Sequence, residues 1–142
     1  MLTNAQRDTL LAAMPSFAPR WTAWQDHQSE YTSRFREETL SEEERELNFV
    51  LELASHITDR FTTPTIGEEL TALFAALEDI YADADANLKV LLTLSLLEQL
   101  MLYLEQKGDD PAILEQYILG PLTTRAWRTA WDWMHPSEPP ST

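Results

Sequence analysis

Apolar residues recur along this chain at every third or fourth position, which is the period of an amphipathic α-helix. No alternating pattern typical of a β-strand extends beyond four residues, and most of the eight prolines fall at segment boundaries. We therefore expect an all-α fold, an irregular bundle of about six to seven helices that forms a single domain over residues 1–135. Stacked helical pairs, as in a short α-solenoid, are an alternative arrangement, but the chain shows no measurable internal repeat.

Capping residues and prolines predict the helix boundaries. Thr3 with Gln6, and Ser41 with Glu44, have the spacing of a capping box, so one helix is expected after Thr3 and another after Ser41. The other expected helices lie at about 19–38, 65–81, 86–107, 110–119 and 121–134. The helix after Ser41 is expected to bury the stripe Leu47, Val50, Leu51, Ala54, Ile57 and Phe61. The polar tail at residues 136–142 has nothing to bury, and we expect it to be disordered.

The segment 86–107 is apolar on most of its circumference. Lys89, Glu98 and Gln99 interrupt it, and charges at mid-membrane depth are costly, so the segment favours a buried helix over a membrane span. We expect it to lie at the centre of the bundle and to be the most buried helix.

Charge is the strongest compositional signal. The chain has 24 acidic and 10 basic residues and a formal net charge of −14. Such a surface repels nucleic acid and anionic membranes and attracts basic proteins. The charge is densest at residues 37–46, where six carboxylates stand against a single basic residue, Arg45. We expect these carboxylates to bind a basic partner: Glu37, Glu38, Glu42, Glu43, Glu44 and Glu46.

Five tryptophans are many for a chain of 142 residues. Trp21 with Trp24, and Trp127 with Trp131, have helical spacings that are typical of packing contacts. Trp133 lies off that stripe, so we expect it to be exposed and to take part in partner binding.

No motif indicates catalysis, a metal or a cofactor, and we expect none of these. The chain has no cysteine, no glycine-rich phosphate loop and no GxSxG or HExxH motif. Asp83, Asp85 and Asn87 resemble the opening of a calcium loop, but Leu88 and Leu94 occupy the positions that need glycine and glutamate. We expect Asp85 to cap the following helix instead.

Two further groups of polar residues have competing interpretations. Glu52, His56 and Asp59 share one helix face, where polar pairing is favoured over a metal site because no second helix carries matching ligands. Glu78 and Glu98 lie beside apolar stripes, and a buried carboxylate must be paired or protonated. We expect each to lie at the stripe's edge or to be satisfied by an arginine or a helix N-terminus; a shared functional pocket is the alternative.

The chain resembles a family of small all-helical bacterial proteins, uncharacterised or described as immunity proteins, that are often encoded beside polymorphic or contact-dependent toxins. The likeness covers residues 15–125. It rests on the opening MPSFAPRWTAWQDH, a glutamate that ends one apolar helix (Glu78), a short acidic link, and a leucine-rich helix with a glutamate (Glu98). The resemblance implies an inhibitor that binds a cognate toxin and brings no catalytic residues with it.

The first interpretation is therefore an immunity protein that blocks a basic toxin by binding it. The cysteine-free composition and the lack of a signal-like N-terminus predict a cytoplasmic location. The alternatives are an acidic helical adaptor or regulatory module, of which a nucleic-acid mimic is a variant, and an enzyme with a carboxylate pocket around Glu78 and Glu98. The oligomeric state stays open.

Overall fold

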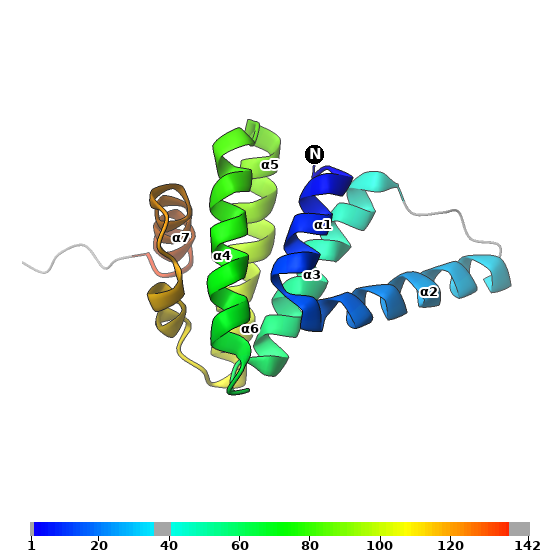
Figure 1. Cartoon of the computed structure of the whole chain (residues 1–142), viewed down its shortest axis with the longest axis horizontal. Helices are drawn as coiled ribbons and strands as arrows, with labels where there is room; N and C mark the ends of the chain where they lie inside the picture. Colours follow the sequence, from blue (N-terminus) through cyan, green and yellow to red (C-terminus); the bar gives the residue numbers. More distant parts are fainter. Residues whose placement is uncertain (1, 36–40, 137–142) are drawn as a thin grey trace, which may run out of the picture.

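The computed structural model describes residues 2–35 and 41–136, and it confirms the all-α fold (Figure 1). Within those residues no strand occurs. The α-helices are α1 (Asn4–Ala13), α2 (Ala18–Phe35), α3 (Glu42–Arg60), α4 (Ile66–Asp83), α5 (Ala86–Val90), α6 (Gln99–Lys107) and α7 (Pro121–Met134). Two 3₁₀ segments, η1 (Pro15–Phe17) and η3 (Pro111–Tyr117), and one π-helical segment, η2 (Leu91–Glu98), complete the chain.

Helix ends follow the predicted capping residues in most cases. At α1 the capping box is complete, because the Thr3 hydroxyl accepts from the Gln6 N–H and the Gln6 side chain accepts from the Thr3 N–H. Ser41 accepts from the Glu44 N–H at the start of α3. Thr65 precedes α4 with helical backbone angles, and its side chain forms no capping hydrogen bond. Gly108 ends α6 in the left-handed region, as glycine permits.

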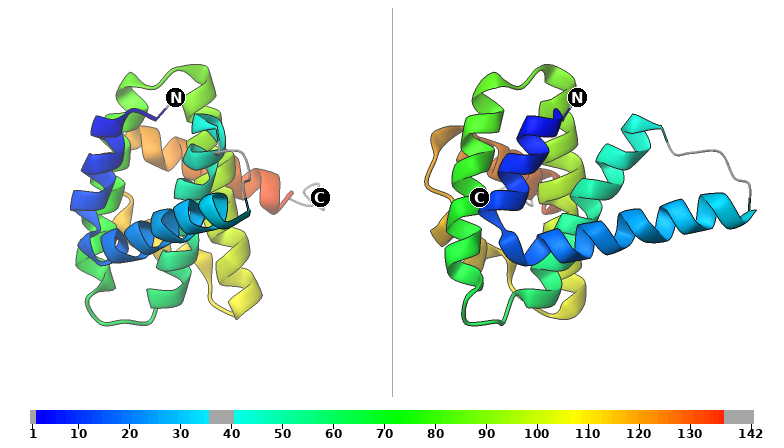
Figure 2. Two further views of the ribbon diagram at one scale, coloured as in Figure 1. Left: turned by 90° about the vertical axis from the view of Figure 1, so that its right-hand side faces the viewer. Right: turned by 45° about the vertical axis from the view of Figure 1, so that its right-hand side comes forward.

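The helices pack most closely with partners that are distant in sequence. In Figure 1, α3, α4 and the continuous helix α5–η2–α6 run alternately down, up and down, and α1 lies beside α4. The close approaches join α1 to α4, α3 to η2 and α6, and α7 to η2 and α4. The left view of Figure 2 shows α7 crossing the other helices. Because non-neighbouring helices interleave, the fold is an irregular bundle rather than a stack of repeated pairs.

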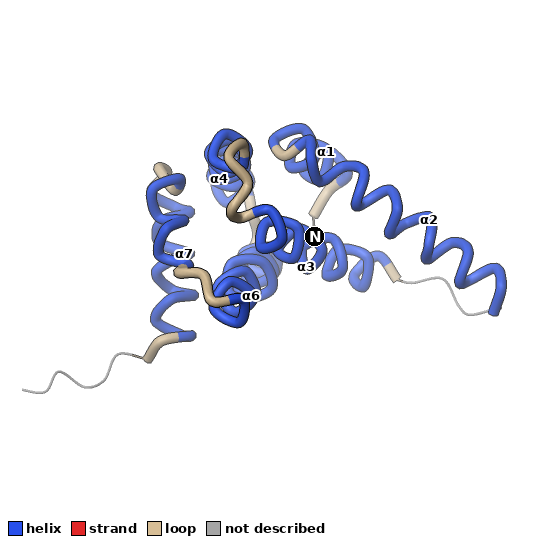
Figure 3. The backbone as a smooth tube through the Cα atoms, turned by 90° about the horizontal axis from the view of Figure 1, so that it is seen from below, coloured by secondary structure: helices blue, strands red, loops and turns tan. Residues whose placement is uncertain are grey.

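Helix α2 projects from this bundle, which is clear from the side and from below (Figures 1 and 3). It is held at its base by aromatic contacts. The Trp21 ring packs edge-on against Phe49, with ring centroids 4.9 Å apart, and stacks on Trp24 with planes 6° apart. Phe17 contacts both Trp21 and Phe49. Beyond this base, Thr22, Ala23 and residues 25–27 are exposed.

One contiguous hydrophobic core runs through the molecule, with members from Leu2 to Ala130. Helix 86–107 is long and apolar enough to cross a membrane by length and composition, yet it packs inside this bundle, with 39% of its most apolar window buried. The expectation that it is the most buried helix is wrong. Val90 is 55% and Leu94 41% exposed, because α3 and α7 cover only part of its circumference.

Candidate functional site

The predicted acidic cluster divides into three parts in the structure. Glu37 and Glu38 lie outside the described residues. Glu42, Glu43 and Glu44 form the first turn of α3 and are exposed, and we call them the acidic turn. Negative side chains at a helix N-terminus interact favourably with the helix dipole, so this turn also stabilises the start of α3.

Glu46 departs from the expectation of a solvated carboxylate, because only 6% of it is exposed. The buried face of α3 shares Val50, Ala54 and Ile57 with the predicted stripe, but it is rotated at its start, where Leu47 is 41% exposed. Phe49, Val50 and Leu53 are all fully buried. Glu46 lies three, four and seven positions before those buried residues, which places it on the same inward face. Phe17 and Trp21 cover Phe49, and this contact between distant segments determines which side of α3 faces the core.

The buried carboxylate of Glu46 lines a cavity of about 270 Å³. Its Oε1 atom is buried and accepts no hydrogen bond from the residues that the structure describes. A buried acceptor without a donor is costly, so this oxygen is suited to receive a donor from outside the chain. The cavity is lined by residues from the N-terminal segment and from the start of α3: Leu2, Thr3, Asn4, Arg7, Glu42, Arg45 and Glu46.

Trp133 is 73% exposed, whereas Trp127 is buried and Trp131 half-buried, which confirms the predicted exposure. Helix α7, which carries these residues, lies at the opposite end of the molecule from α2 (Figure 1). The start of α3, with the acidic turn, belongs to the α2 side of the bundle. The predicted partner-binding residues therefore lie on separate surfaces rather than on one face.

A polar network joins η1, α2, α3 and α4 at the base of α2. Arg20 donates to Glu52 at 3.0 Å and to Asp59 at 2.7 Å, which bears out polar pairing on this face of α3. His56 Nε2 lies 2.8 Å from the Ser16 hydroxyl. Burial, with the nearby positive charges of Arg20 and Arg60, lowers the pKa of His56.

The sequence did not predict this network, because Ser16 and Arg20 lie more than 30 residues before their hydrogen-bond partners. A serine hydroxyl that is hydrogen-bonded to a neutral imidazole also has the arrangement in which histidine can activate serine as a nucleophile. Among the described residues, however, no carboxylate is hydrogen-bonded to His56 to orient its ring. The Ser16 N–H instead donates to Glu69 at 3.0 Å, so Ser16 fastens the η1 corner to both α3 and α4.

Glu78 is satisfied by a helix N-terminus, as one of its predicted alternatives required. Its carboxylate accepts from the N–H of Leu122, the N–H of Thr123 and the hydroxyl of Thr123, at 2.8–3.2 Å. Burial alone would raise the pKa of Glu78, but these three hydrogen bonds together lower it. Gly120 lies so close to the Glu78 carboxylate that a Cβ atom there would overlap it. Glu78 therefore works as the N-terminal cap of α7.

Glu98 stays apart from that arrangement. Its Oε2 atom is buried and has no hydrogen-bond partner in the part of the chain that the structure describes. The cavity that contains Glu78 is lined by Thr71, Ala75, Asp79, Tyr117, Leu119 and Gly120, and Glu98 is not among them.

Asp85 accepts from the Leu88 N–H at 2.8 Å, the capping role that was expected for it. Within the described residues no group of three or more histidine and acidic side chains is arranged to hold a metal ion.

Comparison with known proteins adds a family match. A family model described as a domain of unknown function, DUF7674, matches residues 7–135. No curated protein matches the chain, and no solved structure matches it. The match begins within α1 and extends past the end of α7, so it covers nearly the whole bundle.

Proposed function

Since the chain belongs to the DUF7674 family, a domain of unknown function, we propose from its own residues that it is a protein-binding module of the immunity type. It would bind a basic toxin domain through the acidic turn and block that domain by covering it. Occlusion needs no chemistry from this chain, only a surface complementary to the partner's active site.

The observation that carries the proposal is the juxtaposition of exposed and buried carboxylates at the start of α3. Glu42, Glu43 and Glu44 are exposed, and in a chain of net charge −14 they accelerate encounter with a basic surface. Directly behind them lies Glu46, which lines the same cavity as Glu42 and whose Oε1 is buried without a donor among the described residues. The exposed carboxylates act at long range, and the buried one acts only on contact.

Glu46 gives that contact a direction. A lysine or arginine side chain of the partner that entered the cavity would bring a donor to Glu46, whose Oε1 has no donor among the described residues. Arg7 and Arg45 line the same cavity, and the Arg7 guanidinium is bound to Asn4. A partner is therefore met by both signs of charge at one place, which favours a specific orientation over loose attraction.

The function is tested by co-expression. The reading frame next to this gene would be expressed in a bacterial host with and without this chain. If the neighbouring protein arrests growth and this chain restores it through a stable complex, the immunity proposal is supported. A neighbour that is harmless, or toxicity that this chain does not relieve, would contradict it and leave the adaptor reading.

Binding kinetics separate the two kinds of carboxylate once a partner is in hand. The triple variant Glu42→Gln, Glu43→Gln, Glu44→Gln should slow association several-fold with little change in dissociation, because it removes charges that act on the partner before contact. Such steering is screened beyond about 8 Å at physiological salt. Glu46→Gln should instead speed dissociation. A matched control removes three exposed acids from α4 (Glu68→Gln, Asp79→Asn and Asp83→Asn). If that control slows association equally, net charge rather than the acidic turn steers the partner.

A further inference from the structure

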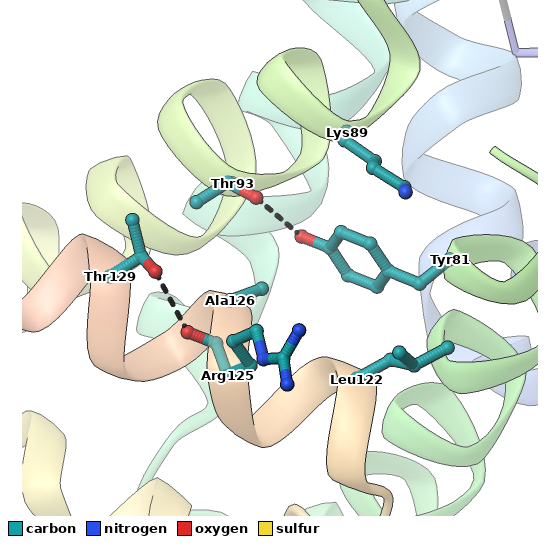
Figure 4. Close-up of a pocket in the computed structure, with 7 residues that line it drawn as sticks. All are labelled: Tyr81, Lys89, Thr93, Leu122, Arg125, Ala126 and Thr129. Carbon is teal, nitrogen blue, oxygen red and sulfur yellow. Dashed lines mark hydrogen bonds between the residues drawn. The ribbon is translucent and has the colours of Figure 1, made fainter. Parts of the chain in front are cut away.

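A second cavity, of about 190 Å³, lies between α4, the α5–η2 segment and α7 (Figure 4). Its lining contains two cations, three hydroxyl groups and no carboxylate, and its apolar wall is made by the Tyr81 ring, Leu122 and Ala126. The lining residues are Tyr81, Lys89, Thr93, Leu122, Arg125, Ala126 and Thr129. We call this the cationic cavity. A cavity without a single acidic residue is unexpected in a chain whose acids outnumber its bases by 24 to 10.

The two cations come from elements that differ in charge from the rest of the molecule. Lys89 is the one charged residue of α5, and α7 has Arg125 and Arg128 against Asp132 alone. Neither Lys89 nor Arg125 forms an ion pair with a described residue, whereas Arg20 and Lys107 do. Figure 4 shows both side chains extending toward the Tyr81 ring, one from α5 and the other from α7.

The hydroxyl groups of the cationic cavity are held in place. The Tyr81 hydroxyl lies 2.9 Å from the Thr93 hydroxyl, and Tyr81 is only 4% exposed. Thr129 donates to the Arg125 carbonyl, so its hydroxyl is also oriented. Burial raises the pKa of Tyr81 from its ordinary value near 10, at which the phenol is already neutral at physiological pH, to about 12. Thr93 belongs to the π-helical segment, a kind of distortion that is frequent at functional sites.

We propose that the cationic cavity binds a small organic carboxylate. Its carboxylate would lie between Lys89 and Arg125, and its short carbon chain would lie against the Tyr81 ring, Leu122 and Ala126. A fork of guanidinium N–H groups matches a carboxylate in two hydrogen bonds, and an ammonium adds a point charge. The volume is below the 300–1,000 Å³ or so that is usual for drug-sized ligands, which restricts the occupant to a few heavy atoms.

The proposal is independent of toxin binding, because its residues lie on α4, α5, η2 and α7 and the acidic turn lies on α3. It is tested by titrating the ¹⁵N-labelled full chain with butyrate, butyramide and inorganic phosphate at matched ionic strength in chloride. Butyramide has the carbon chain without the charge, and phosphate has the charge without the chain. We expect saturable shifts with butyrate at the amides of Thr93, Ala126 and Thr129, and weaker or no saturation with the other two.

Variants assign the response to the cavity. Arg125→Gln and Lys89→Gln should each weaken butyrate binding about tenfold, the usual effect of losing a charge-assisted hydrogen bond. Arg128→Gln is the matched control, because Arg128 lies on the same helix and outside this cavity. Both test residues are exposed, so the variants should fold, and their unshifted spectra would verify it.

Four outcomes would overturn the proposal. The first is no saturable response to butyrate, and the second is an equal response to butyramide, which would leave the cations without a role. The third is an equal loss in Arg128→Gln, which would indicate general attraction to α7. Saturation with phosphate that equals butyrate would also overturn it, since the apolar wall would then contribute nothing.

Discussion

Helices α2 and α4 have the same length, 18 residues each, but they differ in how much of each helix packs against the bundle. Helix α4 lies inside the bundle, contacts α1, α7 and η3, and buries residues along its whole length, from Ile66 to Tyr81. Helix α2 is held at its base by Trp21 and Trp24 and then leaves the bundle (Figure 1). Helix formation alone does not hold a segment in the fold, since most helical stability in proteins comes from packing of an apolar face.

The largest effect on stability is expected from truncation of a fully buried side chain in α4. Leu77→Ala should lower the free energy of unfolding by about 2–5 kcal/mol, because it removes buried methyl groups and leaves a cavity. Thr22→Ala, on the exposed side of α2, should change it by less than about 0.5 kcal/mol. Urea denaturation of both variants measures the two values. Similar losses would mean that α2 is packed as firmly as α4.

The junction of α4 with α7 should respond next most strongly. Glu78→Ala leaves the buried Thr123 N–H and hydroxyl without their acceptor and should cost about 1–3 kcal/mol, whereas Asp79→Ala, on the exposed face, should cost little. Gly120→Ala should cost a similar amount, because its methyl group displaces the same carboxylate. The double variant should lose less than the sum of the two, and strict additivity would show that the two residues act separately.

A smaller and more local effect is expected at the base of α2. Trp24→Ala removes the stacked partner of Trp21 and should lower stability by about 1–2 kcal/mol. Hydrogen exchange should accelerate in residues 18–28 and stay unchanged in α4, because the two helices share no stacked contact. Acceleration in both helices would show that they unfold as one unit.

The smallest expected effect is a pH dependence of the corner that precedes α2. The pKa of His56 is lowered in the folded state, chiefly by burial, so between that pKa and the unfolded value near 6.5 the unfolded chain binds more protons. Stability should therefore fall as pH drops through about 6.5. Wild type and His56→Gln would be compared at pH 7.5 and 5.5 by urea denaturation. The variant should lose less, and equal losses would assign the pH dependence to the carboxylates.

Features fixed by local sequence could be predicted, and features that depend on distant contacts could not. The α1 capping box, the Asp85 cap and the left-handed Gly108 each follow from residues within three or four positions of one another. The exposure of Trp133 follows from the helical period of α7 alone. These features use interactions that form within a single helix or turn.

The rotated face of α3 is a different case. Leu47 and Phe49 are both apolar, and only the arrival of Phe17 and Trp21 from another segment decides that Phe49 turns inward, taking Glu46 with it. The cationic cavity was missed for the same reason, because its residues come from positions 81 to 129 and form no local motif. The immunity role stays a prediction, since the structure supplies surfaces for a partner and no partner.

The projecting helix α2 also has a mechanical consequence. At 1.5 Å per residue its 18 residues extend about 27 Å, close to the width of a small domain. The part of α2 beyond the Trp21–Phe49 contact, from Trp21 to Phe35, extends about 21 Å. A rotation of about 10° at this contact would carry the Phe35 end of the helix through about 4 Å. Sub-ångström adjustments among three aromatic rings therefore set the position of the outermost part of the molecule.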